Sequence, residues 1–223
     1  MIIQVKYIDI HSHKKQDTDA IRIVDLSEEL DANLRIKHYY SLGIHPWYIK
    51  ESMLDEQLMK IEVHMNANSF LTIGECGLDK VCATGIELQL LAFKKQIALS
   101  EKYQKPLVLH VVKAYNDVMQ LRLATGAKQT WIVHGFNGSP QLAKQLTDLG
   151  LYISFGSQLG KYGSKVCKSI ASVPLNRLFL ETDNSDYTIE DIYTLAAACL
   201  NMDKVQLRQH LRRNFQEVFR QDF

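Results

Sequence analysis

Residues 70–111 read FLTIGECGLDKVCATGIELQLLAFKKQIALSEKYQKPLVLHV, and this stretch decides the fold. It begins and ends with short apolar runs, FLTIGE (70–75) and PLVLHV (106–111), of the kind that forms strands. Between them, residues 85–104 place apolar side chains at helical spacing. Because nearly continuous apolar strands are typical of parallel sheets covered by helices, the stretch predicts a strand–helix–strand unit with parallel strands.

The same pattern extends along the chain of 223 residues. Six further runs of strand character occur at 5–11, 20–26, 39–45, 130–135, 151–156 and 177–182. Further helical segments occur at 114–126, 139–150, 188–201 and 204–221. Eight strands alternating with helices predict an α/β fold, a compact (β/α)8 TIM barrel in a single domain over 1–223. An open doubly wound sheet is the alternative, and the lack of a GxGxxG loop after the first run counts against it.

The first third of the chain is less regular. Roughly nine residues separate the first two runs, which is fewer than a crossover helix needs. We therefore expect either a hairpin or a distorted barrel in this region.

Composition and charge narrow the class of protein. The net charge of +1 excludes a strongly basic nucleic-acid coat, so an anionic substrate must be held by a local site. The four cysteines, at 76, 82, 167 and 199, form no CxxC pair, which favours reduced thiols. The N-terminus meets polar residues too early for a signal peptide, and no run approaches the roughly 18 apolar residues of a membrane helix. We expect a cytoplasmic monomer that makes no membrane contact.

Metal-type side chains recur at the ends of the predicted strands. Five of them lie at or near the ends of five different runs: His11, Glu75, His110, His134 and Asp183. Because the carboxyl ends of barrel strands meet at one mouth, these side chains are expected to converge. His13 joins them, since residues i and i+2 of a strand share a face. Imidazole and carboxylate are ligands for zinc and other divalent ions, and six donors suit two ions that share a carboxylate.

Other residues near these donors have more than one interpretation. His45, in GIHPW (43–47), supports a ligand or binds a substrate phosphate, or is structural. Lys113 is a candidate phosphate contact or a solvated surface lysine. Trp47 and Tyr48 offer a stacking surface for a base or simply pack.

Two acidic residues also lie in these runs. Glu181 is expected to be a buried ion-pair partner or a residue of the barrel wall. Asp9 shares the parity of His11 and His13, so alternation places it deeper on the same strand face, where it would support them from behind.

Seven motifs, in this order, resemble those of the TatD family of metal-dependent hydrolases: IDIHSH (8–13), SLGIHPW (41–47), IGECGLD (73–79), PLVLH (106–110), IVHGFNGS (132–139), LFLETD (178–183) and NFQEVF (214–219). They cover nearly the whole chain. The resemblance implies a distorted TIM barrel with two divalent ions and deoxyribonuclease activity. It places the first ion on His11, His13, Glu75 and Asp183. It places the second ion on Glu75, His110 and His134, so that Glu75 bridges the two.

This chain departs from the family pattern beside the fourth histidine. The family usually has arginine two residues after it, where this sequence has Val112 followed by Lys113. The leading hypothesis is a hydrolase of DNA phosphodiesters in which two metals activate a water, with Asp183 and Glu75 as catalytic residues and His45 and Lys113 as substrate contacts. Zinc, magnesium, manganese and nickel all fit such donors.

Two other functions stay open at this point. One is hydrolysis of an amide, ester or lactone of a small molecule by the same metal site. The other is a barrel that binds metal or a partner without turnover.

Overall fold

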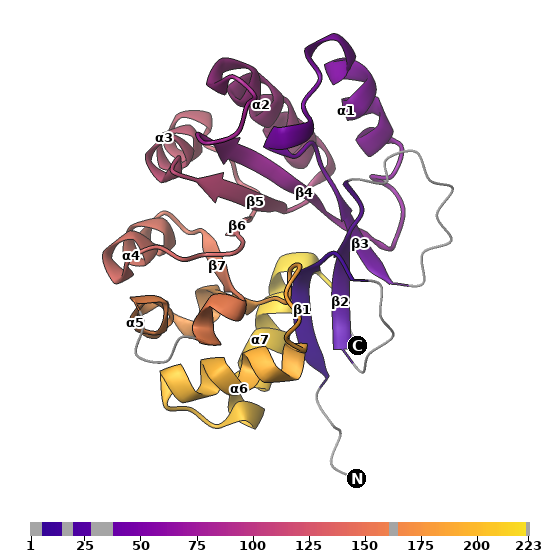
Figure 1. The fold of residues 1–223 in the computed structure, drawn as a ribbon. Coiled ribbons are helices and arrows are strands. Elements are labelled where there is room, and N and C mark those ends of the chain that lie inside the picture. The colour runs from indigo at the N-terminus through magenta and orange to yellow at the C-terminus, as the bar shows by residue number, and fades with distance from the viewer. Residues whose placement is uncertain (1–5, 15–19, 28–37, 161–164, 222–223) are drawn as a thin grey trace. The chain divides into compact units, whose positions relative to one another are not determined.

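The computed structural model describes residues 6–14, 20–27, 38–160 and 165–221. Within these ranges it contains eight strands: β1 (Tyr7–Ser12), β2 (Ala20–Asp25), β3 (Tyr39–Leu42), β4 (Phe70–Asp79), β5 (Leu107–Val112), β6 (Trp131–Val133), β7 (Tyr152–Phe155) and β8 (Leu178–Leu180). The same ranges contain seven α-helices: α1 (Leu54–Glu62), α2 (Ile86–Tyr103), α3 (Tyr115–Thr125), α4 (Pro140–Asp148), α5 (Lys165–Ser172), α6 (Ile189–Leu200) and α7 (Lys204–Phe219). Each of the eight predicted runs overlaps one of these strands (Figure 1).

The strands follow each other in the sheet in chain order, from β1 to β8. The pairs β1–β2, β3–β4, β4–β5, β5–β6 and β7–β8 are all parallel. From β3 onward, one of the helices α1 to α5 lies between each strand and the next along the chain. Sequential parallel strands connected by helices are the topology of the (β/α)8 barrel. The predicted fold class is confirmed, and the doubly wound alternative, whose strand order reverses, is wrong.

The hairpin considered for the first third of the chain is also wrong. β1 and β2 run parallel, with Tyr7 opposite Ala20. A six-residue strand is about 20 Å long, and the eight peptide links from Ser12 to Ala20 reach up to about 27 Å. A parallel return therefore needs no helix, which leaves the distorted barrel as the correct alternative.

Contacts between residues divide the chain into two compact units, which are described separately. Unit 1 comprises Met1–Val24 and His134–Phe223, and unit 2 comprises Asp25–Val133.

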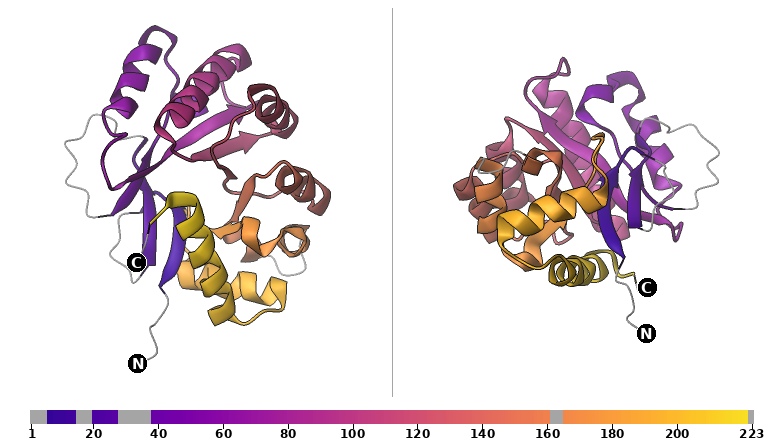
Figure 2. Two further views of the ribbon diagram at one scale, coloured as in Figure 1. Left: turned by 180° about the vertical axis from the view of Figure 1, so that it is seen from behind. Right: turned by 60° about the horizontal axis from the view of Figure 1, so that its bottom comes forward.

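In unit 1, helices α6 and α7 pack beside β1 (Figure 2). The buried hydroxyl of Tyr193, on α6, accepts a hydrogen bond from the backbone N–H of Ile8 (3.1 Å) and donates one to the Ile8 carbonyl (3.2 Å). Asn214, on α7, donates to the carbonyls of Leu175 and Leu178 at β8 (2.7 and 2.8 Å). These bonds fix β1 and β8. His11 lies on β1, and His13 and Asp183 follow the ends of the two strands.

In unit 2, two buried glutamines of α2 bind the backbone next to His45 and at the end of β4, the strand that contains Glu75. Gln96 accepts from the N–H of Ile44 (2.7 Å) and donates to its carbonyl (3.2 Å). Gln89 makes the same two bonds with the backbone of Asp79 (2.7 and 2.9 Å). Because an amide side chain replaces a missing backbone partner at both places, α2 positions the loop before His45 and the end of β4.

The expectation of four reduced cysteines is wrong for one pair. Cys167 and Cys199 form a disulfide between α5 and α6, with Cα atoms 5.2 Å apart. The cysteines lie 32 residues apart in the chain, and only the packing of the two helices brings them together. Cys76 and Cys82 are free thiols.

Among the described helices, none combines the length and the apolar character that crossing a membrane requires.

Candidate metal centre

Unit 1 brings together three of the predicted ligands. One ligand atom from each of His11, His13 and Asp183 lies within 4.8 Å of the others. Oδ1 of Asp183 is 3.8 Å from Nε2 of His11 and 3.5 Å from Nε2 of His13. His11 is fully buried, whereas His13 and Asp183 are partly exposed. The group therefore combines a fixed inner ligand with donors that solvent reaches.

Backbone pairing explains why these residues meet. The N–H of Asp183 donates to the carbonyl of His11 (3.0 Å), and the N–H of His13 approaches the carbonyl of Asp183 (3.4 Å). Asp183 lies three residues beyond β8 and has a φ of 51°. Aspartate is one of the few residue types that tolerate this left-handed conformation. The turn after β8 thus lays the carboxylate of Asp183 across the end of β1.

His134 belongs to the same unit and directly follows β6. Its ring centroid lies 4.6 Å from that of His11. Its Nδ1 lies 3.4 Å from Oε1 of Glu181, a fully buried carboxylate that also accepts from the N–H of Gly135 (2.6 Å). Burial acts to raise the pKa of Glu181, but the hydrogen bond and the charge of His134 outweigh it, so the pKa lies below its ordinary value. Glu181 is a buried partner of a histidine, as expected.

Within the described residues, the carboxylate of Asp9 makes no direct hydrogen bond to the two histidines, contrary to the support that was expected. The register of β1 against β2 shifts between Asp9 and Ser12, so simple alternation fails between Asp9 and His11. The carboxylate of Asp9 accepts instead from Nε of Arg22 (2.8 Å), and from the backbone N–H and the hydroxyl of Thr182 (3.0 and 2.8 Å). These bonds join β1 to β2 and to the segment after β8.

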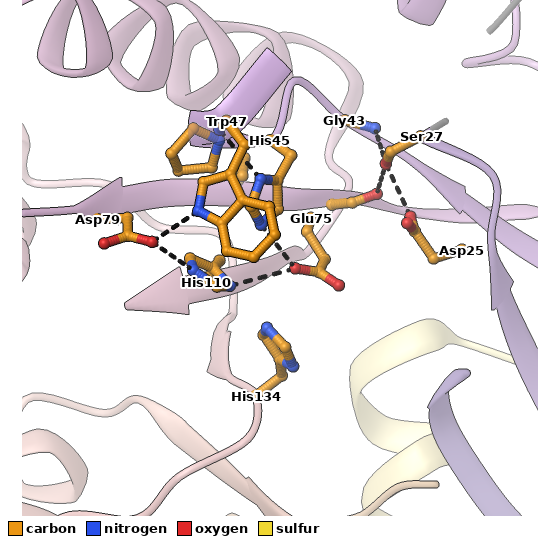
Figure 3. A network of polar contacts seen from close by, with 12 residues as sticks. Asp25, Ser27, Gly43, His45, Trp47, Glu75, Asp79, His110 and His134 are labelled. Atoms are coloured by element: carbon orange, nitrogen blue, oxygen red, sulfur yellow. Dashed lines mark hydrogen bonds and ion pairs between the residues drawn. The ribbon is translucent and has the colours of Figure 1, made fainter. Parts of the chain in front are cut away.

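Unit 2 holds the second group, which Figure 3 shows. Nδ1 of His110, on β5, lies 3.3 Å from Oε2 of Glu75, on β4. Nε2 of the same ring lies 3.3 Å from Oδ2 of Asp79, which is 1% exposed. If Asp79 fixes the ring proton on Nε2, the lone pair of Nδ1 faces the Glu75 carboxylate. A histidine held from behind by a buried carboxylate is the usual arrangement of a metal ligand.

Asp79 ends the motif IGECGLD (73–79), which predicts no role for it. Burial opposes its ionisation, but bonds from the indole of Trp47, the N–H of Val81 and His110 hold its pKa below the ordinary value. It lies four residues after Glu75 in the long strand β4. No local sequence pattern predicts the partners of Asp79, because Trp47 and His110 are distant from it in the chain.

Glycines give β4 the shape that presents Glu75. The register of β4 against β5 shifts between Ile73 and Cys76, which places an irregularity at Glu75. A Cβ on Gly74 would lie 2.7 Å from Cβ of Val108. Gly77 has a φ of 132°, and a Cβ there would clash with the carbonyl of His110. Side chains at these two positions would push β4 away from β5 and separate Glu75 from His110.

The other neighbour of Gly74 is a buried hydroxyl. Oγ of Ser27 lies 3.0 Å from the Gly74 carbonyl and 2.7 Å from Oδ1 of Asp25, and it accepts from the N–H of Gly43 (3.1 Å; Figure 3). This network fixes the backbone just before Glu75.

His45 approaches the same oxygen of Glu75 as His110, and the centroids of the two rings lie 4.3 Å apart. Its Nδ1 accepts the backbone N–H of Trp47 (3.1 Å), and its Nε2 lies 3.2 Å from Oε2 of Glu75. With Nδ1 occupied as an acceptor, the neutral ring carries its proton on Nε2, the nitrogen that faces the carboxylate. This geometry favours a donor to Glu75 over a nitrogen that offers a lone pair to an ion.

Lys113, the predicted phosphate contact, is less enclosed by neighbouring residues than His45. Lys113 is exposed, follows β5 and has a φ of 54°. Val112, at the position of the family arginine, is the last residue of β5 and is half-buried.

The donors of each unit fit divalent metal ions by their chemistry. Both sets combine imidazole nitrogens with carboxylate oxygens, which suits zinc, manganese and nickel and, through the carboxylates, magnesium. His110 and His134 each have one ring nitrogen next to a buried carboxylate, so the other nitrogen is oriented for a ligand.

The sequence matches the family model described as TatD related DNase over residues 6–220. The chain is 32% identical over 147 residues to an uncharacterized metal-dependent hydrolase of Buchnera aphidicola, which covers 65% of this chain and 55% of that protein. It is 30% identical over 151 residues to the uncharacterized metal-dependent hydrolase YjjV of Escherichia coli K12, which covers 66% of this chain and 58% of that protein. The chain thus spans less than two thirds of the length of these relatives.

Solved structures agree on the fold. The crystal structure of YjjV, a TatD homolog from Escherichia coli K12, matches with a TM-score of 0.83 and 23% identity, covering 98% of this chain and 99% of that one. A hydrolase TatD family protein from Entamoeba histolytica matches with a TM-score of 0.76 and 18% identity, covering 96% and 98%. At these identities the likeness shows the barrel fold alone. Because the family model spans nearly all of its residues, this chain belongs to the TatD related DNase family.

Proposed function

We propose that this chain is a metal-dependent hydrolase that cleaves DNA phosphodiester bonds, acting as a single domain over 1–223 and as a monomer in the cytoplasm. The observation that carries the proposal is the placement of His110 between two carboxylates, Asp79 behind it and Glu75 in front. The name of the family supports DNA as the substrate.

The proposal joins the donors of both units in one centre with two divalent ions. His11, His13, Glu75 and Asp183 would hold the first ion, and Glu75, His110 and His134 the second. This assignment rests on family membership and on the rule that barrel strands present their carboxyl ends at one mouth. Glu75 has the two oxygens that a bridging ligand needs, and the His45 N–H would orient one of them.

When bound, such ions lower the pKa of a coordinated water toward neutrality and offset the charge of the phosphate. Asp183 is the proposed acceptor of the proton from the attacking water, because its carboxylate is partly exposed beside His13. The water oxygen forms the new bond to phosphorus, and the sugar oxygen leaves with a proton. Lys113 would contact the phosphate backbone in place of the family arginine.

A second candidate is hydrolysis of an amide, ester or lactone. Val112 favours it, because an apolar residue stands where the family usually has an arginine suited to bidentate phosphate binding. The two relatives from Buchnera aphidicola and Escherichia coli are described as metal-dependent hydrolases without a named substrate, and this also leaves room for the second candidate.

A substrate panel separates the two candidates. The purified protein, supplied in turn with zinc, manganese, magnesium or nickel, is assayed on single-stranded oligonucleotides and on a set of esters, lactones and amides. The proposal expects oligonucleotide cleavage that EDTA abolishes. Turnover confined to the small carbonyl substrates would replace the DNA proposal with the second candidate.

A further inference from the structure

Trp47 lies in the short 3-10 helix Pro46–Tyr48 of unit 2, beside the second group of candidate ligands. Its indole Nε1 donates to Oδ2 of Asp79 (2.7 Å), and its backbone N–H donates to Nδ1 of His45 (3.1 Å). The ring is therefore fixed at both ends, in the position that Figure 3 shows.

The same ring is unusually open for a tryptophan. Its exposed fraction is 56%, whereas Trp131, the second tryptophan of the chain, is fully buried. Leaving a large aromatic surface in water forgoes the stabilisation that its burial would bring. A purely structural tryptophan would gain by packing inward, but this one is anchored by a buried carboxylate while much of its surface stays accessible.

Its location connects it to the candidate centre. The indole centroid lies 5.0 Å from the ring of His45 and 6.0 Å from the ring of His110, and both rings meet it nearly perpendicularly, at 81° and 75°. The neighbouring Tyr48 ring is also tilted against it, by 78°. No ring contact among the described residues stacks parallel to the indole.

We infer that Trp47 is a stacking platform for a nucleobase of the substrate, next to the phosphate that is cleaved. The inference rests on the proposed function, because it needs a nucleic-acid substrate. Stacking on an aromatic side chain is tolerant of sequence, since every base presents a π-face. Trp47 acts through binding, so its replacement is expected to raise KM more than it lowers kcat.

The test compares two substrates with the same phosphates, the oligonucleotide dT4 and an abasic tetramer whose sugars are tetrahydrofuran. For Trp47→Leu, the ratio of kcat/KM for dT4 to that for the abasic tetramer should fall by about 10- to 100-fold, mainly through the KM for dT4. Trp47→Phe keeps a ring but loses the bond to Asp79, so it should keep most of this ratio. Leu123→Ala, which removes an open apolar side chain (68% exposed) from α3, serves as the control with an unchanged ratio.

A second readout does not depend on turnover. Phosphorothioate dT4, which resists cleavage, should quench the tryptophan emission of the wild type and not that of Trp47→Leu, because only buried Trp131 remains in the variant. An unchanged substrate ratio in Trp47→Leu, or equal quenching of the two proteins, overturns the inference and leaves the DNase proposal standing. Absence of turnover on both tetramers overturns the DNase proposal, and the quenching result then decides the stacking inference by itself.

Discussion

The carboxylate of Asp79 lies 3.3 Å from Nε2 of His110, and the opposite nitrogen of that ring lies 3.3 Å from Glu75. A single imidazole thus links a fully buried carboxylate to a candidate bridging ligand. Such outer carboxylates set the orientation and the basicity of metal-binding histidines.

Replacement of Asp79 with Asn should weaken metal binding by about 10- to 100-fold, because the ring of His110 loses its charged partner. Calorimetric titration of the metal-free protein with Mn²⁺ or Zn²⁺ measures this directly. Asp117→Asn, which neutralises the partly exposed partner of Lys80, is the matched control and should bind metal like the wild type. Equal affinities in Asp79→Asn and wild type would mean that Asp79 does not orient a ligand.

The buried pair of Arg22 and Asp9 should be a stability element and not a catalytic one. Their side chains are 7% and 0% exposed. Arg22→Ala leaves the Asp9 carboxylate buried with only Thr182 as its donor, and this should cost about 3–5 kcal/mol in the free energy of unfolding. Urea denaturation gives the value. Arg213→Ala, at an exposed position of α7, should change it by less than about 0.5 kcal/mol. A loss below 1 kcal/mol in Arg22→Ala would contradict the account.

Alkaline pH should destabilise the protein through Tyr115. Burial raises the pKa of this phenol from 10.0 to about 12. Because the folded state holds the proton more tightly than the unfolded state, the stabilisation is fully present below pH 10 and disappears as the pH rises to about 12. Tyr115→Phe should lose about 2–3 kcal/mol less than the wild type across this interval, as measured by denaturation at pH 10 and pH 12. Equal losses in the two proteins would show that the phenol of Tyr115 ionises normally.

The disulfide between Cys167 and Cys199 closes a loop with a sequence separation of 32 residues. Loop-closure entropy for such a length amounts to about 3–4 kcal/mol, so the double variant Cys167→Ser/Cys199→Ser should unfold at a lower temperature. Thiol titration of the unfolded, unreduced protein should find two reactive thiols, from Cys76 and Cys82. Four thiols in protein isolated without reductant would show that the pair stays reduced and would contradict this prediction.

The sequence predicted the elements of the fold well because local patterns govern them. Ser139 caps α4 by accepting the N–H of Leu142, with Pro140 in the first turn, so a local signal marks the start of this helix. Strand periodicity likewise located all eight strands. The parallel pairing of β1 with β2 could not be predicted from the sequence, because the short connection is long enough for either a hairpin or a parallel return.

The candidate site was predictable only in part. Donor residues such as His11 and Asp183 were visible as residue types at strand ends, but they meet through backbone pairing between β1 and the turn after β8. The role of Asp79 depends on partners from two other segments, and the placement of Asp9 depends on a register shift. Alternation along a strand fails wherever such a shift occurs, and no local pattern announces it.

We propose above all that Glu75 joins two ions in one centre. Its most direct test is the metal content of wild type and Glu75→Ala after dialysis against Mn²⁺ or Zn²⁺, measured by inductively coupled plasma mass spectrometry. Circular dichroism and the unfolding temperature establish that the variant is folded. We expect two ions per chain in the wild type and the loss of both together in Glu75→Ala. Retention of two ions, or loss of one with the other bound as tightly as before, would contradict it.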